Sequence, residues 1–111
     1  MKVHERIWLE DDNGNYIIGD GGLELLKTIE ETGSMKQAAD KLGMSYRFVW
    51  GKIRKMEQRL GLSIMNRHKG GKDGGSSILT DDMIAFIKKY ERMKKDVNQY
   101  AEKKLGGLKF Q

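Results

Sequence analysis

The stretch that decides the fold of this chain is GSMKQAADKLGMSYRFVW, residues 33–50. It predicts two short helices joined by a tight turn. Ser34 is a suitable N-cap for the first helix, and Gln37 three residues later completes the pattern of a capping box. Gly43 stands where the chain must turn sharply, because glycine adopts a positive φ at little cost. Ser45 can cap the second helix, so the stretch is typical of a helix-turn-helix.

The second of these helices is expected to have one apolar and one basic face. The residues that recur at helical spacing and should point inward are Val49, Ile53, Met56 and Leu60, with Phe48 partly in the core. The opposite face holds Tyr46, Arg47, Trp50, Gly51 and Arg54. A helix-turn-helix presents such a second helix to the DNA major groove. DNA binding is therefore the leading hypothesis.

The positive charge of the chain is concentrated at this motif. The formal net charge is +5, made up of −5 over residues 1–35, +8 over residues 36–72 and +2 over residues 73–111. A solvated basic face without a partner would give the same distribution of charge along the chain. Its coincidence with a helix-turn-helix favours a surface that faces phosphates.

Length and composition exclude several classes of protein. The 111 residues predict one domain, residues 1–111, and the absence of cysteine excludes disulfides and thiolate metal sites. No apolar run is long enough to span a bilayer and no signal-peptide pattern opens the chain, so we expect a cytoplasmic, nucleoid-associated protein with no membrane partner. His4 and His68 lack metal-ligand spacing, and no nucleophile lies beside a base. We therefore expect no enzyme activity, metal or cofactor.

An N-terminal β-hairpin is expected within residues 1–20. Its strands would be Val3–Glu10 and Tyr16–Ile18, joined by a turn containing Asn13-Gly14, the strongest short signal for a hairpin. A helix over Leu23–Thr32 should follow, ending at a glycine.

The residues after the second helix of the motif predict a wing. Strands at Ser63–His68 and Ser77–Leu79 would enclose a glycine-rich basic loop, residues 69–76. Such a loop can approach phosphates or the minor groove closely. It lacks the GxxxxGK[ST] spacing of a nucleotide-binding loop. The helix-turn-helix and the wing together would occupy residues 21–79.

A long last helix is expected over residues 80–105, with Thr80 as its cap. A heptad stripe runs along it through Met83, Phe86, Tyr90, Met93, Val97 and Tyr100. So small a domain cannot cover the whole helix. Its first turns should join the core, and the interface with the same helix of a second subunit is assigned to Tyr90, Met93, Val97 and Tyr100. The predicted fold is mainly α with small β: a winged helix-turn-helix with an N-terminal hairpin and a long C-terminal dimerisation helix.

The candidate DNA contacts fall into three groups. On the second helix of the motif they are Ser45, Tyr46, Arg47, Trp50, Arg54 and Lys55. At the start of the preceding helix they are Ser34, Lys36 and Gln37, and in the wing Arg67, Lys69, Gly70, Gly71 and Lys72. Arg47 is assigned to base edges, since a guanidinium binds guanine O6 and N7 together. Arg54 and Lys55 are assigned to phosphates, and Trp50 either to DNA or to packing against the preceding helix.

Over roughly residues 19–90 the chain resembles the N-terminal domain of ModE-type molybdate-responsive regulators, which share features with LysR-like winged helices. The matching segments are residues 25–29, Gly33-Ser34, Ala38-Ala39, residues 43–47, Val49-Trp50, Ile53, Met56-Glu57, Arg67, residues 70–72, Gly74-Gly75 and Leu79-Thr80. The resemblance implies a winged helix-turn-helix homodimer that binds palindromic DNA and regulates transcription in bacteria or archaea. It also implies that the hairpin and last helix take part in dimerisation.

The chain also departs from that family. Full-length members carry C-terminal oxyanion-binding domains that sense molybdate, so the chain is expected to be a stand-alone form in which molybdate binding does not carry over. Gly22 replaces a frequent arginine, Asp73 interrupts the wing glycines, and Met83 replaces a common glycine. Two alternatives to a sequence-specific regulator stay open, a non-specific architectural DNA-binding protein and a winged-helix module for protein interaction. The residues do not define the operator, the direction of regulation, or an unidentified effector or protein partner.

Overall fold

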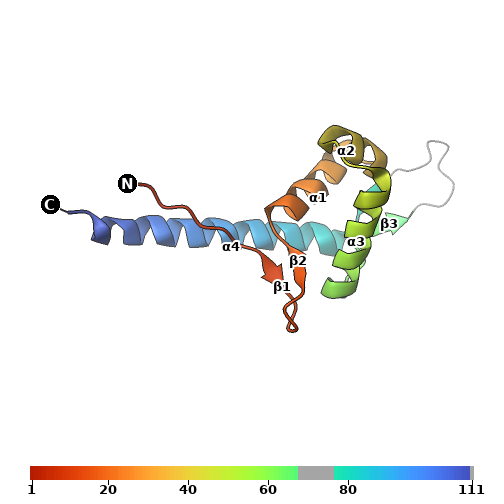
Figure 1. Cartoon of the computed structure of the whole chain (residues 1–111). Helices are drawn as coiled ribbons and strands as arrows, with labels where there is room; N and C mark the ends of the chain where they lie inside the picture. Colours follow the sequence, from red (N-terminus) through yellow and green to blue (C-terminus); the bar gives the residue numbers. More distant parts are fainter. Residues whose placement is uncertain (68–76, 111) are drawn as a thin grey trace.

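The computed structural model describes residues 1–67 and 77–110 of the chain. Its elements are β1 (Leu9–Glu10), β2 (Tyr16–Ile18), α1 (Asp20–Thr32), α2 (Met35–Leu42), α3 (Tyr46–Leu60), β3 (Met65–Arg67), β4 (Ser77–Leu79), α4 (Asp81–Leu105) and a 3₁₀ turn, η1 (Gly106–Leu108). Helices dominate, with one short hairpin before α1 and one between α3 and α4 (Figure 1). The predicted fold class is confirmed.

The core lies between α1, α2, α3, the two hairpins and the first half of α4. Its fully buried side chains include Ile18, Leu25, Leu26, Ile29, Ala38, Val49, Ile53, Ile64 and Met83. On α2 the small residues Ala38 and Ala39 are both buried, so neighbouring helices can approach this helix closely. The packing fixes the orientation of α3, whose opposite side is left uncovered.

The caps expected from the sequence are present. The Ser34 hydroxyl accepts a hydrogen bond from the Gln37 backbone N–H at 3.2 Å, and the Ser45 hydroxyl accepts one from the Phe48 N–H at 3.1 Å. Between these helices Gly43 has a φ of 68°, and its N–H bonds back to α2. These local interactions set the turn between α2 and α3.

The N-terminal hairpin is shorter than predicted. β1 and β2 are antiparallel and pair Leu9 with Ile18, but the expected strand from Val3 begins only at Leu9. Residues 1–8 instead run beside α4 (Figure 1). The Tyr90 hydroxyl donates to the Ile7 carbonyl at 3.0 Å, and the Asn98 side-chain amide donates to the Glu5 carboxylate at 3.1 Å. β2 has three residues and is too short to pair with residues 1–8, so this segment is bound by α4 instead.

Two other boundaries differ from the prediction. α1 begins at Asp20, three residues before the expected Leu23, so Gly22 lies inside the helix, against Ile18 and Met56. A Cβ on Gly22 would lie 3.0 Å from Ile18 Cγ1, so any side chain here would press on the buried Ile18. The strand expected from Ser63 begins at Met65, since the Ser63 and Ile64 carbonyls accept hydrogen bonds from Thr80.

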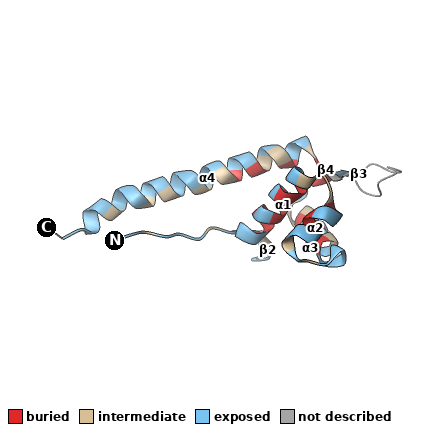
Figure 2. Cartoon of the chain, turned by 90° about the horizontal axis from the view of Figure 1, so that it is seen from above, coloured by how far each residue is buried: buried red, intermediate tan, exposed pale blue. Residues whose placement is uncertain are grey.

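The two halves of α4 have different surroundings (Figure 2). In the first half Met83, Ile87 and Tyr90 are buried. In the second half the stripe is exposed, with relative exposures of 39% for Met93, 40% for Val97 and 64% for Tyr100. Tyr90 is only 3% exposed, so this residue, which we had assigned to the subunit interface, belongs to the core of its own chain.

Polar contacts also hold α4 against α1. Lys27 on α1 pairs with Glu91 at 3.0 Å, and Lys94 pairs with Asp20 at 2.7 Å. The hydrogen bond from the Lys94 ammonium lowers the pKa of the Asp20 carboxyl. These contacts fix the direction in which the second half of α4 leaves the body of the domain.

Among the described residues, no helix combines the length and apolar content that a membrane crossing requires.

Tyr90→Phe should loosen the N-terminal segment at a small cost in stability. The variant keeps the buried ring and loses only the hydrogen bond to the Ile7 carbonyl, which is expected to lower the free energy of unfolding by about 0.5–1.5 kcal/mol. Urea titration measures this loss, and hydrogen exchange of residues 1–8 should quicken. Tyr46→Phe removes an exposed hydroxyl from α3 and should change neither quantity. If the two variants had the same free energy of unfolding and the same hydrogen exchange, the contribution assigned to the bond between Tyr90 and Ile7 would be contradicted.

Candidate nucleic-acid interface

The outer face of α3 is exposed and basic. Val49, Ile53 and Met56 turn inward, as predicted. Exposed on other sides of the helix are Tyr46, Arg47, Phe48, Gly51, Arg54 and Lys55. The predicted inner and outer faces are therefore present, and the cationic residues assigned to DNA lie on the outer one.

Phe48 is the exception, because it was expected partly in the core and is 52% exposed. Successive helical residues are about 100° apart, so Phe48 and Trp50 lie on opposite flanks of the buried Val49. The core covers the Trp50 flank, and Trp50 is partly buried against it. Phe48 lies on the same flank as Lys52, and its ring is left exposed beside that residue. Above the Trp50 ring, the Arg54 guanidinium lies 5.5 Å from the centroid, which holds this cation beside the exposed face.

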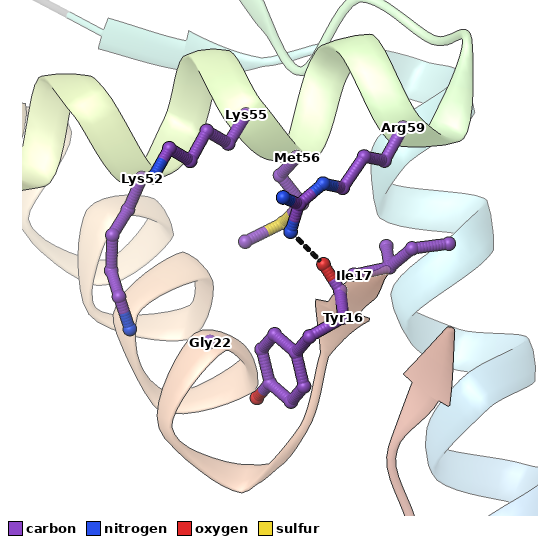
Figure 3. Close-up of a pocket in the computed structure, with 7 residues that line it drawn as sticks. All are labelled: Tyr16, Ile17, Gly22, Lys52, Lys55, Met56 and Arg59. Carbon is purple, nitrogen blue, oxygen red and sulfur yellow. Dashed lines mark hydrogen bonds between the residues drawn. The ribbon is translucent and has the colours of Figure 1, made fainter. Parts of the chain in front are cut away.

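A second row of cations lies on the flank of α3 that faces β2. Lys52, Lys55 and Arg59 line a hollow whose other walls are Tyr16, Ile17, Gly22 and Met56 (Figure 3). Arg59 donates a hydrogen bond to the Tyr16 carbonyl, which ties α3 to the hairpin. Lys52 and Lys55 form no ion pair within the part of the chain that the structure describes. Of the three, only Lys55 is among the contacts predicted from the sequence, although the spacing 52, 55, 59 places all three on one side of the helix.

The other predicted contact residues are placed as follows. Lys36 and Gln37 are exposed in the first turn of α2, where the Ser34 hydroxyl caps the helix. Arg67 is the last residue of β3, which pairs with β4 in antiparallel register, Met65 opposite Leu79. Lys69, Gly70, Gly71 and Lys72 lie outside the described residues, as does His68. Within the described residues, no group of three or more histidine, aspartate or glutamate side chains could hold a metal ion.

Gly51→Ala should stabilise the folded chain. Gly51 lies inside α3, and a Cβ there would meet nothing within 4 Å. Alanine in a helix interior is favoured over glycine by about 0.5–1 kcal/mol, so the thermal midpoint should rise by several degrees, about 4–8 °C per kcal/mol. Gly22→Ala is the matched control, since its Cβ would press on Ile18 and should lower the midpoint. A fall in the midpoint of Gly51→Ala would contradict the open surroundings of this residue.

Comparison with known proteins gives one family and a consistent fold. Residues 21–82 match the family of bacterial regulatory helix-turn-helix proteins of the lysR type. The DNA-binding transcriptional dual regulator ModE of Escherichia coli K12 is 40% identical over 69 residues, 62% of this chain and 26% of that protein. The transcriptional regulator ModE of Haemophilus influenzae is 30% identical over 73 residues, 66% of this chain and 29% of that protein. The chain thus spans less than a third of these relatives.

Two solved complexes show the same fold. The crystal structure of the CbnR DNA-binding domain with DNA has a TM-score of 0.57 and 20% identity, and covers 78% of this chain and 94% of that one. The BenM DNA-binding domain with catB site 1 DNA has a TM-score of 0.54 and 20% identity, and covers 80% and 93%. At this identity the likeness establishes the winged-helix fold.

Proposed function

The chain belongs to the lysR family of bacterial regulatory helix-turn-helix proteins, and from this premise we propose that it is a sequence-specific transcriptional regulator that binds a palindromic operator as a homodimer. The observation that carries the proposal is the outer face of α3. It presents Arg47 and Arg54 to solvent opposite the side chains that anchor the helix in the core, and Lys55 is exposed beside them. A recognition helix needs this arrangement, a rigid base and a free cationic face.

In the proposed complex α3 lies in the major groove. Arg47 binds guanine O6 and N7, and the other groove-facing residues are Ser45, Tyr46 and Trp50. Arg54 and Lys55 bind phosphates and fix the position of the helix without selecting a sequence. Ser34, Lys36 and Gln37 at the start of α2 meet the backbone on one side. Arg67, Lys69, Gly70, Gly71 and Lys72 of the wing meet it on the other.

The second half of α4 is proposed as the dimer interface. Met93, Val97 and Tyr100 form an exposed apolar stripe on a helix that extends beyond the body of the domain (Figure 2). A second copy of the helix would bury this stripe and hold two α3 helices about 34 Å apart, one turn of DNA. On this proposal residues 1–111 are one domain, with the hairpin in 1–20, the motif and wing in 21–79, and the dimerisation helix in 80–105. The protein would act in the cytoplasm, on nucleoid DNA.

Selection of bound fragments from random duplex DNA tests the proposal. The experiment should be run at about 150 mM salt, because lower ionic strength favours purely electrostatic binding. We expect enrichment of a palindrome with half-sites one helical turn apart. Binding without enrichment would support a non-specific architectural protein instead. No binding would contradict DNA recognition by this chain and support a module for protein interaction.

A further inference from the structure

Phe48 is a large apolar side chain on an otherwise basic surface. It lies in the first turn of α3, and its backbone N–H is fixed by the bond to the Ser45 hydroxyl. Phe48 is 52% exposed, and because it precedes the buried Val49 it lies on a flank of α3, at the edge of the outer face. Side chains in the first turn of a recognition helix are the ones that reach base edges. An exposed apolar ring here has a specific partner in DNA, the 5-methyl group of thymine.

We propose that Phe48 selects thymine in the half-site by apolar contact between its ring and the 5-methyl group. The proposal rests on the proposed function, because it assumes that α3 enters the major groove. It gives Phe48 a part of the sequence recognition. This part is supplied neither by the cations of the interface nor by the family match. Cytosine lacks the methyl group, so the contact discriminates between the pyrimidines.

The neighbours of Phe48 suit this contact. Lys52, one turn further along, places its ammonium 5.5 Å from the centre of the ring. In a complex this cation can bind a phosphate beside the base that the ring touches, while the ring keeps its open surface. Gly51, three residues after Phe48, offers no side chain, and the space in front of it is empty. The helix surface beside the ring can therefore approach the base edges closely.

The position of Arg47 makes the prediction more specific. Arg47 and Phe48 are consecutive, so their side chains leave α3 about 1.5 Å apart along the axis and about 100° apart around it. Both reach the groove from the same turn. A guanine bound by Arg47 and a thymine bound by Phe48 should therefore lie at neighbouring base pairs of each half-site.

The experiment replaces each thymine of the selected operator, one symmetric pair at a time, by deoxyuridine, which removes only the methyl group. Binding of the wild type and of Phe48→Ala is then measured by fluorescence anisotropy. Burial of one methyl group corresponds to about a fourfold change in affinity, so we expect about a 15-fold loss for the wild type at one symmetric pair. Phe48→Ala should bind the thymine operator that much more weakly and be indifferent to uridine there. Phe48→Leu keeps an apolar contact and should retain part of the sensitivity.

Phe110→Ala is the matched control, because Phe110 is almost fully exposed and lies beyond α4. It should keep the full response to uridine. Indifference of the wild type at every thymine would overturn the proposal, as would a Phe48→Ala variant that keeps the wild-type sensitivity. A uniform loss of affinity in Phe48→Ala would mean that the ring only supports Lys52, and would also overturn it. Absence of any preferred operator would overturn the proposed function as well, which separates the two failures.

Discussion

Replacing Arg47 by alanine should weaken binding to the selected operator by about 30-fold to 10⁴-fold. A guanidinium that binds guanine at two atoms contributes about 1–3 kcal/mol of discrimination, and a homodimer on a palindrome loses two such contacts. Arg47 is exposed on α3, so its truncation leaves the core untouched. Binding to random DNA should fall far less, since it depends on the total of phosphate contacts. Anisotropy titrations with operator and random duplexes measure both affinities.

Two control variants separate base recognition from charge. Arg92→Ala removes the same charge from α4, where Arg92 pairs with Asp96 at 3.4 Å, and should leave operator binding nearly unchanged. Arg47→Lys keeps the charge but lacks the planar fork, so it should lose much of the preference for the operator and little of the affinity for random DNA. If Arg47→Ala weakened both DNAs equally, Arg47 would be a phosphate contact and the assignment to a base would be wrong.

The elements that sequence analysis predicted well are those set by local interactions. The serine caps and the glycine turn of the α2–α3 unit depend on residues within four positions of one another, and the structure has them at Ser34, Gly43 and Ser45. The turn at Asn13-Gly14 was equally predictable, and Gly14 has the positive φ, 84°, that glycine favours. In such places the side chains that decide the conformation are visible in the sequence itself.

The errors share one physical origin, contacts between residues far apart in the chain. Helical periodicity gives the angle of Phe48 relative to Val49 but not which flank of α3 the rest of the domain covers. The apolar residues of Val3–Glu10 fit a strand, yet Ile7 is bound by Tyr90, 83 residues away. Similarly, a heptad stripe is compatible with burial inside one chain or between two, and Tyr90 belongs to the first case. Of the candidate site, the basic face was predictable and the exposure of Phe48 was not.

Replacing Val97 by aspartate should separate the proposed dimer into folded monomers. Val97 is 40% exposed in the single chain, so the charge remains hydrated there and the fold should persist. In a dimer the same carboxylate would be buried against an apolar stripe without a partner, which is strongly unfavourable. Sedimentation equilibrium should show a monomer at concentrations at which the wild type is dimeric, with an unchanged circular dichroism spectrum. Gln99→Asp is the control, because it adds the same charge to an exposed position on the other side of α4 and should stay dimeric.

DNA binding by Val97→Asp should show what the dimer contributes. When both half-sites are bound by one dimer, the second contact is intramolecular, which raises the affinity for the full operator by about 10²–10⁴-fold. The variant should therefore lose about this factor on the full palindrome and bind an isolated half-site as well as the wild type does, because α3 and its cations are unchanged. Equal loss on both DNAs would mean that the substitution damages the binding domain itself. A wild type that is monomeric both free and on the operator would contradict the assignment of Met93, Val97 and Tyr100, since their exposed stripe would then have no partner in a second copy.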